Sequence, residues 1–313
     1  MEPIRAVVID PKAPERFVIS QVEAPSPGPS QALVRVKAIS LNLGELRRSM
    51  TAEAGARPGW DFAGTVERAA ADGSGPRAGT RVVGMLISGA WAELVAAPTD
   101  TVAPLPDSVS FAQAATLPVA GLTALYSLER NGSVLGRNVL ITGASGGVGH
   151  LACQLARHAG AHVVAVVRRP EREKHARDAG AHQVVVSEDS SPAAKFGPYY
   201  LVLESVGGAS LTAGLSMLAP EGVCVLYGAS ASAETSFDAR AFYLKGGASI
   251  YGFILFHELR RQPAAEGLER LVRLVAEGAL RPHIEIEAPW TEIASIAHRF
   301  YDRGIVGKAV LLF

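Results

Sequence analysis

A glycine loop in the middle of the chain has the spacing that phosphate binding requires. Residues 143–149 read GASGGVG, in which Ala144, Gly146 and Gly149 follow the pattern G-x-G-x-x-G with alanine in the first place. The loop stands between the apolar run NVLIT and an amphipathic helical pattern, so backbone N–H groups and the helix dipole could attract a pyrophosphate. An ordinary tight turn is the alternative, but the strand–loop–helix setting favours a dinucleotide site.

Positive charge follows the second strand of the same unit. The apolar run 162–167 leads into Arg168 and Arg169, and then Arg172 and Lys174. An NAD site normally carries an acidic residue here for the ribose 2′-hydroxyl, whereas a guanidinium can pair with a 2′-phosphate. We therefore expect NADP(H) as cofactor, with Arg168, Arg169 and Lys174 near that phosphate. The alternative is a solvated helix start over 168–174.

The loop also fits the T-G-x-x-x-G-x-G pattern of short-chain dehydrogenases, over residues 142–149. In that family the loop lies near the chain start, whereas here a long β-rich region precedes it. Its catalytic pair is Tyr-x-x-x-Lys, and none of the seven tyrosines has a lysine four residues on. The sequence excludes that family.

Composition limits the partners and the compartment. The chain has 30 basic and 30 acidic side chains, so no basic excess is available to bind nucleic acid. The longest apolar runs, such as 248–256, are too short to span a bilayer, and the first ten residues look like a strand and not like a signal peptide. The two cysteines, Cys153 and Cys224, are far apart in apolar segments, which is typical of a protein in the reducing cytoplasm.

Two kinds of periodicity must position these residues. Up to about residue 115, short Val-rich segments alternate in polarity between turn-forming clusters, which predicts strands of a partly closed barrel. The segments are 4–10, 17–22, 32–40, 64–69, 80–85 and 91–97. From about residue 137, compact apolar runs alternate with helical stretches, which predicts a parallel sheet covered on both faces. A helix over 264–278, a strand over 284–289, a helix over 291–304 and a strand over 307–313 follow. We expect this tail to return partly to the first domain.

Taken together, these features resemble the medium-chain dehydrogenase/reductase superfamily, in its zinc-independent quinone oxidoreductase branch. The similar segments are ISLNLGELRRS, PGWDFAGTV, GAWAELVAA, LPVAGLTALYSL, ITGASGGVGHLACQLARHAGA, VLESVGG and GKAVLLF. The resemblance implies an α/β fold: an N-terminal GroES-like partly closed β barrel plus a Rossmann doubly wound parallel sheet. It implies a catalytic β domain over 1–118, completed by about 280–313, and an NADP-binding domain over 119–279.

At the positions where zinc-dependent members of that superfamily carry their zinc ligands, this sequence lacks the cysteine and histidine residues of that set. These positions read Ser40-Leu41-Asn42 and Gly59-Trp60-Asp61, and no cysteine precedes Cys153. His158 and His162 are four residues apart, but a helix should end near Gly160 between them. We therefore expect no metal. Without a Lewis acid, a substrate that accepts hydride readily fits best, namely a quinone or an alkene conjugated to a carbonyl, with donors and water completing the protonation.

The resemblance also assigns roles to individual residues. It implies that Ser145, Gly146, Gly147 and Val148 hold the pyrophosphate, that Tyr227, Gly228 and Ala229 pass beneath the nicotinamide half, that Phe253 belongs to a segment contacting the nicotinamide amide, and that Thr123 opens the cofactor domain. Asn42, in the L-N-x-x-[DE] segment, would lie near the nicotinamide as the catalytic-site residue; an asparagine after a strand can also be a turn former. The chain departs from the family in lacking a tyrosine over 45–60 and an aromatic residue near Ser187.

Two other functions and one assembly remain open. QLARHAGA and SLNLGEL also resemble polyketide enoyl reductase domains, which implies an enoyl-thioester reductase as the alternative. A non-catalytic NADPH-binding redox sensor is a second alternative. The apolar stretch 249–256 could be an edge strand through which two copies form a homodimer, or a strand that the tail helix buries.

Overall fold

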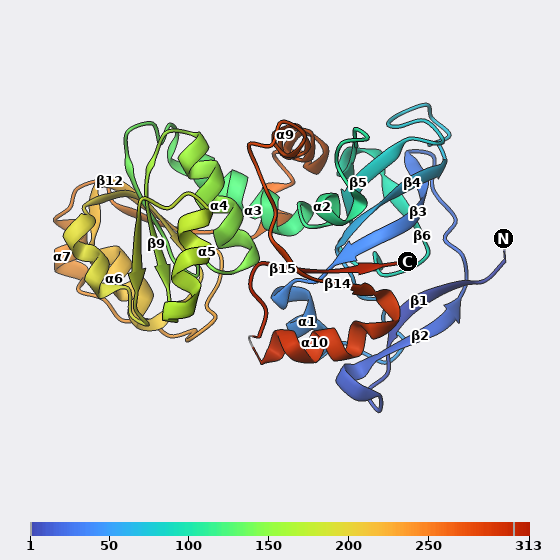
Figure 1. Ribbon diagram of the computed structural model, residues 1–313, viewed down its shortest axis with the longest axis horizontal. Helices are drawn as coiled ribbons and strands as arrows, with labels where there is room; N and C mark the ends of the chain where they lie inside the picture. The colour runs from blue at the N-terminus through green and yellow to red at the C-terminus, as the bar shows by residue number, and fades with distance from the viewer. Residues whose placement is uncertain (1, 303) are drawn as a thin grey trace. The chain divides into compact units, whose positions relative to one another are not determined.

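The computed structural model describes residues 2–302 and 304–313, and its contacts divide the chain into two units. The first unit runs through Leu122 and includes Leu259–Gly278 and Pro282–Phe313. The second unit holds Thr123–Glu258 and Ala279–Arg281. Helix α3 (Pro118–Leu128) contains the last residues of the first unit's opening segment and the first residues of the second. Figure 1 labels some of the elements of each unit.

The second unit is built on six parallel strands in the order β10-β9-β8-β11-β12-β13. Their bounds are β8 (Asn138–Ile141), β9 (His162–Val167), β10 (Gln183–Val186), β11 (Tyr199–Glu204), β12 (Leu218–Leu226) and β13 (Ser249–Gly252). This order is that of a doubly wound nucleotide-binding sheet. Val163, Val164 and Val166 are buried, as continuous apolar strands covered on both faces must be.

Helices cover both faces of that sheet, with α4 (Gly147–His158) and α5 (Glu173–Asp178) on one side and α6 (Gly208–Ser216) and α7 (Ala239–Tyr243) on the other (Figure 1). The 3-10 turn η5 (Ser191–Phe196) connects β10 to β11, and α8 (Leu255–Glu258) follows β13. Helix α4 ends just before Gly160, which has a positive φ of 80°, as the sequence predicted. No helix in the described part of the chain is long and apolar enough to cross a membrane.

The first unit contains a seven-stranded sheet in which β3 is central. Its strands are β3 (Gln31–Ser40), β4 (Asp61–Arg68), β5 (Arg81–Met85), β6 (Leu94–Pro98), β7 (Val102–Pro104), β14 (Ile284–Pro289) and β15 (Lys308–Leu312). Strand β3 pairs with β4, with β6 through Gln31–Arg35, and with the C-terminal strand β15 through Ala38–Ser40. The hairpin β1 (Ile4–Ile9) and β2 (Phe17–Val22) stands beside this sheet as a separate pair.

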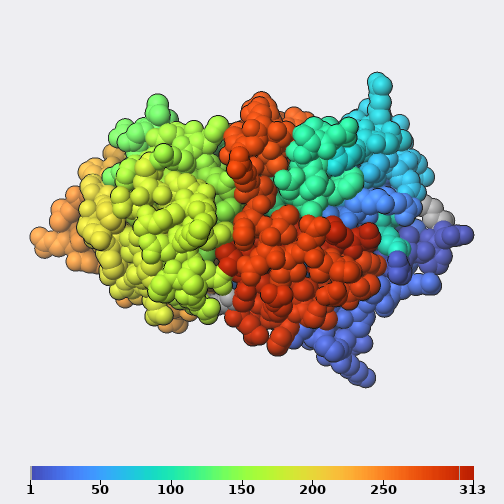
Figure 2. Space-filling model, in the orientation of Figure 1, coloured from blue at the N-terminus to red at the C-terminus, as the bar shows by residue number. Residues whose placement is uncertain are grey.

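Helices from both ends of the chain complete the first unit. They are α1 (Leu43–Ser49), α2 (Phe111–Ala115), α9 (Ala264–Ala276) and α10 (Ile293–Tyr301). The C-terminal residues, red in Figure 2, pack directly beside blue N-terminal ones, and Trp290 stacks on Phe313 with ring centroids 4.3 Å apart. Helix α9 contacts β5 and β7, so this helix groups with the first unit, whereas the sequence analysis expected residues up to 279 in the nucleotide-binding domain.

The expected fold class is confirmed, with one change at the sheet edge. The apolar stretch 249–256 is not one strand, because pairing ends at Gly252 and Leu255 begins the short helix α8. Strand β13 is the last of the sheet, and Ile250 is 40% exposed. The tail helix α9 belongs to the first unit.

Candidate active site

The glycine loop lies at the carboxyl edge of the six-stranded sheet. Gly143 has a positive φ of 59°, and the Ala144 N–H donates to Val166 O at 3.1 Å, which holds the loop against the end of β9. The His150 N–H, bonded to Gly146 O at 2.9 Å, is the first with an intrahelical acceptor. The N–H groups of Gly147 and Val148 have no acceptor among the residues that the structure describes, and the start of a helix attracts an anion to such groups.

Close packing between this helix and the loop explains the last glycine of the pattern. A Cβ at Gly149 would lie 2.5 Å from Gly143 O and 2.7 Å from Ala144 Cα. Both are backbone atoms, so a side chain at this position would push α4 away from β8. Gly149 thus has the helix–strand packing role that dinucleotide-binding loops give to this position.

The loops after β11 and β12 meet the glycine loop. The Ser205 N–H donates to Thr142 Oγ1 at 3.0 Å, and the Ser230 N–H donates to Ser205 O at 3.0 Å. The buried Glu204 carboxylate accepts the N–H groups of Val206 and Gly207 at 2.6 and 2.9 Å, which fixes the loop after β11. Burial nevertheless raises the pKa of Glu204, because desolvation outweighs those donors.

Most of the predicted cofactor residues lie along this edge, at the carboxyl ends of β8, β9, β12 and β13. They are Ser145, Gly146, Gly147, Val148, Arg168, Arg169, Tyr227, Gly228, Ala229 and Phe253. The Phe253 N–H donates to Leu226 O at 2.8 Å, and its side chain is buried. Tyr227 turns its hydroxyl into the unit, where burial raises its pKa.

The basic residues at this edge differ in their partners. Arg168 and Arg169 are exposed at the end of β9, and neither forms an ion pair with any residue that the structure describes. Lys174 lies on α5 and pairs with Asp178 at 2.6 Å, so its ammonium is already engaged. Thr123 is buried in α3, which precedes the first strand of this sheet in the chain, and so it does not belong to any of these strand ends. Arg168 and Arg169 thus differ from Lys174 in having no ion-pair partner among the described residues.

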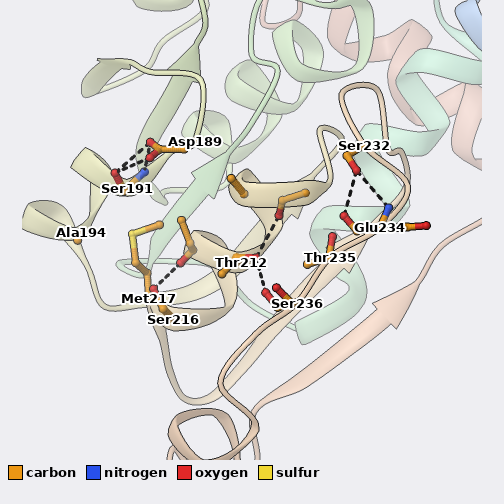
Figure 3. A pocket seen from close by; sticks show the side chains of 13 residues that line it. Asp189, Ser191, Ala194, Thr212, Ser216, Met217, Ser232, Glu234, Thr235 and Ser236 are labelled. Atoms are coloured by element: carbon orange, nitrogen blue, oxygen red, sulfur yellow. Dashed lines mark hydrogen bonds between the residues drawn. The ribbon is translucent and has the colours of Figure 1, made fainter.

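A separate hollow of about 820 Å³ opens beside α6 and η5. Its lining carries hydroxyls and two carboxylates, and Figure 3 shows Ser191 bonded to Asp189 and Thr212 bonded to Ser236. None of the predicted cofactor residues lines it. Asp189 and Glu234 would repel a pyrophosphate, so this hollow does not suit the dinucleotide.

The first unit contains a buried charged cluster around Asn42. The Asn42 Nδ2 group donates to Glu45 Oε1 at 3.0 Å and to Asp61 Oδ2 at 2.8 Å. The Lys308 ammonium donates to Asn42 Oδ1 at 2.6 Å and lies 3.5 Å from Asp61 Oδ2. Glu45 also accepts the Trp60 N–H at 2.8 Å. The end of β3, helix α1, the start of β4 and the C-terminal strand thus meet at one amide.

Burial sets the electrostatics of this cluster. Glu45, Asp61 and Lys308 are all nearly inaccessible. Desolvation raises the pKa of Glu45, and the neighbouring Asp61 carboxylate raises it further, against the opposing effect of Lys308. Desolvation lowers the pKa of Lys308, while both carboxylates oppose that shift. Burial thus disfavours the charged forms of both Glu45 and Lys308, and the opposite charges beside them partly offset that effect.

The residues at the zinc-binding places do not fit a zinc ion. The Ser40 hydroxyl donates to Asp61 Oδ2 at 2.9 Å, Trp60 supplies an indole, and the ammonium of Lys308 stands where a cation would neutralise Asp61. Zinc needs a tetrahedral set of N, S or O donors. Across residues 2–302 and 304–313, no group of three or more His, Cys, Asp or Glu side chains could hold a metal ion.

Sequence reasoning missed the partners of Asn42. The cluster comes from three segments that the sequence analysis quoted: SLNLGEL supplies Asn42 and Glu45, PGWDFAG supplies Asp61 and GKAVLLF supplies Lys308. A charged residue inside an apolar run, such as Lys308 before AVLLF, was the available signal, because a buried charge needs a partner. Nothing local indicated that the partner would be Asn42.

Comparison with known proteins supports this description. Residues 28–107 match the family described as "Alcohol dehydrogenase GroES-like domain", and residues 147–273 match "Zinc-binding dehydrogenase". A quinone oxidoreductase of Pongo abelii is 31% identical over 310 residues, covering 94% of this chain and 92% of the relative. A 2-haloacrylate reductase of Burkholderia sp. is 29% identical, covering 99% of each.

Other similar proteins bear on the cofactor and on the alternatives. A mycobacterial quinone oxidoreductase structure has a TM-score of 0.89 at 26% identity, covering 99% of this chain and 100% of that chain. A mycobacterial structure complexed with NADPH has a TM-score of 0.85 at 27% identity, with the same coverage. A mycocerosic acid synthase-like polyketide synthase of Mycobacterium tuberculosis is 32% identical over 91% of this chain, which corresponds to 14% of that protein.

Proposed function

The chain belongs to the medium-chain dehydrogenase/reductase superfamily, in its quinone oxidoreductase branch, and is an oxidoreductase of that type. We propose that it is a zinc-free, NADPH-dependent reductase of quinones or of alkenes conjugated to a carbonyl. The observation that carries the proposal is the pair of exposed arginines without ion pairs, among the described residues, at the end of β9. A second observation supports the proposal: the cluster of Asn42, Glu45, Asp61 and Lys308 lies at the positions expected for a zinc site.

In this proposal the residues of the second unit bind the dinucleotide. The free N–H groups of Gly147 and Val148 bind the pyrophosphate, and Arg168 and Arg169 bind the 2′-phosphate through charge-assisted hydrogen bonds. Tyr227, Gly228, Ala229 and the Phe253 segment orient the nicotinamide half. When bound, NADPH supplies the hydride.

The proposed substrate class depends on which groups of the chain could polarise a substrate carbonyl. The cluster around Asn42 holds an ammonium, but it is bonded to Asn42 and Leu41 O and is buried. A simple ketone would lack the polarisation that a metal supplies. A quinone or a conjugated alkene spreads the arriving negative charge onto an oxygen, where water can protonate it. The name of the 2-haloacrylate relative describes such a conjugated substrate.

An enoyl-thioester reductase is the second candidate, because the chain also resembles a segment of a polyketide synthase. The experiment that separates the candidates measures NADPH oxidation by EDTA-treated protein with an ortho-quinone, a para-quinone, a simple enone and an enoyl-CoA, and NADH as control. Turnover on quinones or enones with NADPH preferred supports the proposal. Turnover on the thioester alone supports the second candidate, and binding without turnover supports a redox sensor.

We also propose a homodimer formed through strand β13. Phe237, Tyr243, Leu244, Ile250 and Ile254 are exposed apolar side chains in and around this edge strand. Unpaired strand edges with apolar side chains associate readily, and pairing of two such edges would cover them.

A further inference from the structure

Two helix ends in the second unit share nearly the same seven-residue sequence. Residues 156–162 read ARHAGAH at the end of α4, and residues 176–182 read ARDAGAH at the end of α5. Each segment ends its helix in the same way, because Gly160 and Gly180 have positive φ values of 80° and 92° and the N–H of the following alanine bonds back to the helix. The histidine that closes each segment therefore stands at the start of the next strand.

These two histidines stack on each other at the amino ends of β9 and β10. The ring centroids of His162 and His182 are 4.5 Å apart, and the ring planes differ by 25°. The His182 N–H donates to Val163 O at 2.9 Å, and the Val163 N–H donates to His182 Nδ1 at 3.0 Å. The side chain of His182 thus extends the pairing of β10 with β9 by one bond beyond Gln183, the first ladder residue of β10.

The bond from Val163 requires a neutral imidazole. Nδ1 accepts it through its lone pair, so the ring proton of His182 must be on Nε2. The backbone donor fixes this assignment, because a flipped ring would present a carbon atom to the N–H. A proton on Nδ1 would set two N–H groups against each other, and the bond would be lost.

The neighbours of His182 also oppose its protonation. Arg157, in the last turn of α4, comes within 3.2 Å of the place that a Cβ on Gly180 would take. His162 faces the ring from β9, and its own buried Nδ1 has no hydrogen-bond partner among the described residues.

The sign of the pH effect follows from these neighbours. Desolvation, followed by the charges of Arg157 and His162, lowers the pKa of His182; no charged group of α5 contributes to this shift, and β10 carries none. The unfolded chain then takes up the proton at a higher pH than the folded chain. The free energy of unfolding therefore falls as the pH falls below about 6.5, the ordinary value for histidine.

We propose that His182, stacked on His162, forms a pH-sensitive contact that holds β10 on β9 when neutral and releases it when protonated. Strand β10 is the outermost strand on this side of the sheet, so it can separate from β9 while β8 and β11 stay paired. Strand β9 leads from this contact to Arg168 and Arg169. The contact thus acts on the strand pair beside the arginines proposed to bind the cofactor phosphate, but it requires neither cofactor nor substrate.

The test is hydrogen exchange of the full chain without cofactor at pH 7.5 and pH 5.5, corrected for the intrinsic pH dependence of exchange. Protection of peptides covering 162–167 and 182–187 should fall up to about tenfold, because a released histidine is about ten times more favoured by protonation at the lower pH. His182→Asn keeps an oxygen that can accept the Val163 N–H but does not titrate, so its protection should change less than about twofold. His257→Asn, the same change at an exposed histidine of α8, is the matched control and should behave as the wild type.

Three results would overturn the proposal. They are an equal loss of protection in the wild type and in His182→Asn, no loss in the wild type, and a loss at pH 5.5 that peptides of β8 and β11 share, since the last would mean global unfolding. If His182→Asn does not fold at pH 7.5, His182→Gln, whose amide also accepts without titrating, serves in its place.

Discussion

At the residue scale, the arginines after β9 allow a direct test of cofactor choice. Replacing Arg168 and Arg169 together by alanine should raise the KM for NADPH about 10-fold or more, because each charge-assisted hydrogen bond to the 2′-phosphate contributes about 1.5–3 kcal/mol before solvent screening. The KM for NADH, which has no 2′-phosphate, should stay within about twofold. Steady-state kinetics with both cofactors measures the ratio.

The control for this pair is Arg68→Ala, which removes an exposed arginine from the first unit. It should leave both KM values unchanged. Equal losses with NADPH and NADH in the Arg168 and Arg169 variant would show that the arginines act on folding or on the pyrophosphate, and would contradict their role in choosing NADPH.

The two thiols give a residue-scale prediction with a pH dependence. Cys153 and Cys224 are fully buried. Burial raises the pKa of Cys153 to about 12, and burial together with the Glu204 carboxylate raises that of Cys224. At pH 8 only about 1 in 10⁴ of the Cys153 side chains would be thiolate, and this fraction rises about tenfold per pH unit. Native protein should therefore not react with a thiol-specific disulfide reagent at pH 8.

The same reagent in guanidinium chloride should titrate both thiols, which is the positive control. NADPH should slow any reaction of the native protein, because a ligand that binds only the folded state suppresses opening. Reaction of one thiol within minutes under native conditions would mean that the second unit opens locally near α4 or β12.

At the element scale, the contact between α4 and its loop predicts the effect of adding one methyl group. Gly149→Ala would place Cβ 2.5 Å from Gly143 O. The helix must shift, and overpacking of this kind costs about 1–3 kcal/mol of the free energy of unfolding. Urea denaturation followed by circular dichroism measures the loss, and the affinity for NADPH should fall with it because the start of α4 moves.

Gly146→Ala is the matched control for folding. Its Cβ would come no closer than 3.4 Å, to Gly143 O, and its φ of −84° suits alanine. This variant should unfold at nearly the wild-type urea concentration. A stability loss as large as that of Gly149→Ala would show that the loop tolerates no side chain anywhere, and that helix packing is not the cause.

The elements themselves were largely predictable, because strands and helices have local patterns. The valines of 162–167 predicted a buried strand, and the glycine loop predicted a helix after it, which begins at Gly147. The end of β13 was missed, although Gly252 inside the apolar run IYGFILF, where the pairing ends, was an available signal. The cluster around Asn42 was out of reach. Lys308 follows Asn42 by 266 residues, and the pairing of β15 with β3, in which Val310 lies opposite Ser40, brings the two together.

At the scale of the whole molecule, the exposed edge of the six-stranded sheet predicts assembly. Ile250→Asp should convert a dimer to a monomer, because a carboxylate on the edge strand would face its own copy and would have to be desolvated. Sedimentation velocity over a range of protein concentrations measures the change. The Asp side chain at this exposed position does not enter the core. The midpoint of thermal unfolding of the variant should therefore lie below that of the wild-type dimer only because the partner is lost.

Ile87→Asp provides the comparison, since Ile87 is an exposed isoleucine in the first unit and lies far from β13 in the chain. If any exposed apolar residue could mediate association, both variants would dissociate. If the edge strand mediates association, only the Ile250→Asp variant dissociates. The backbone amides of Tyr243, in α7, and of Leu244, its C-cap, should then be protected from hydrogen exchange in the dimer and not in the monomer. A wild-type chain that sediments as a monomer at every concentration would contradict the assembly, and those exposed side chains would then need another partner.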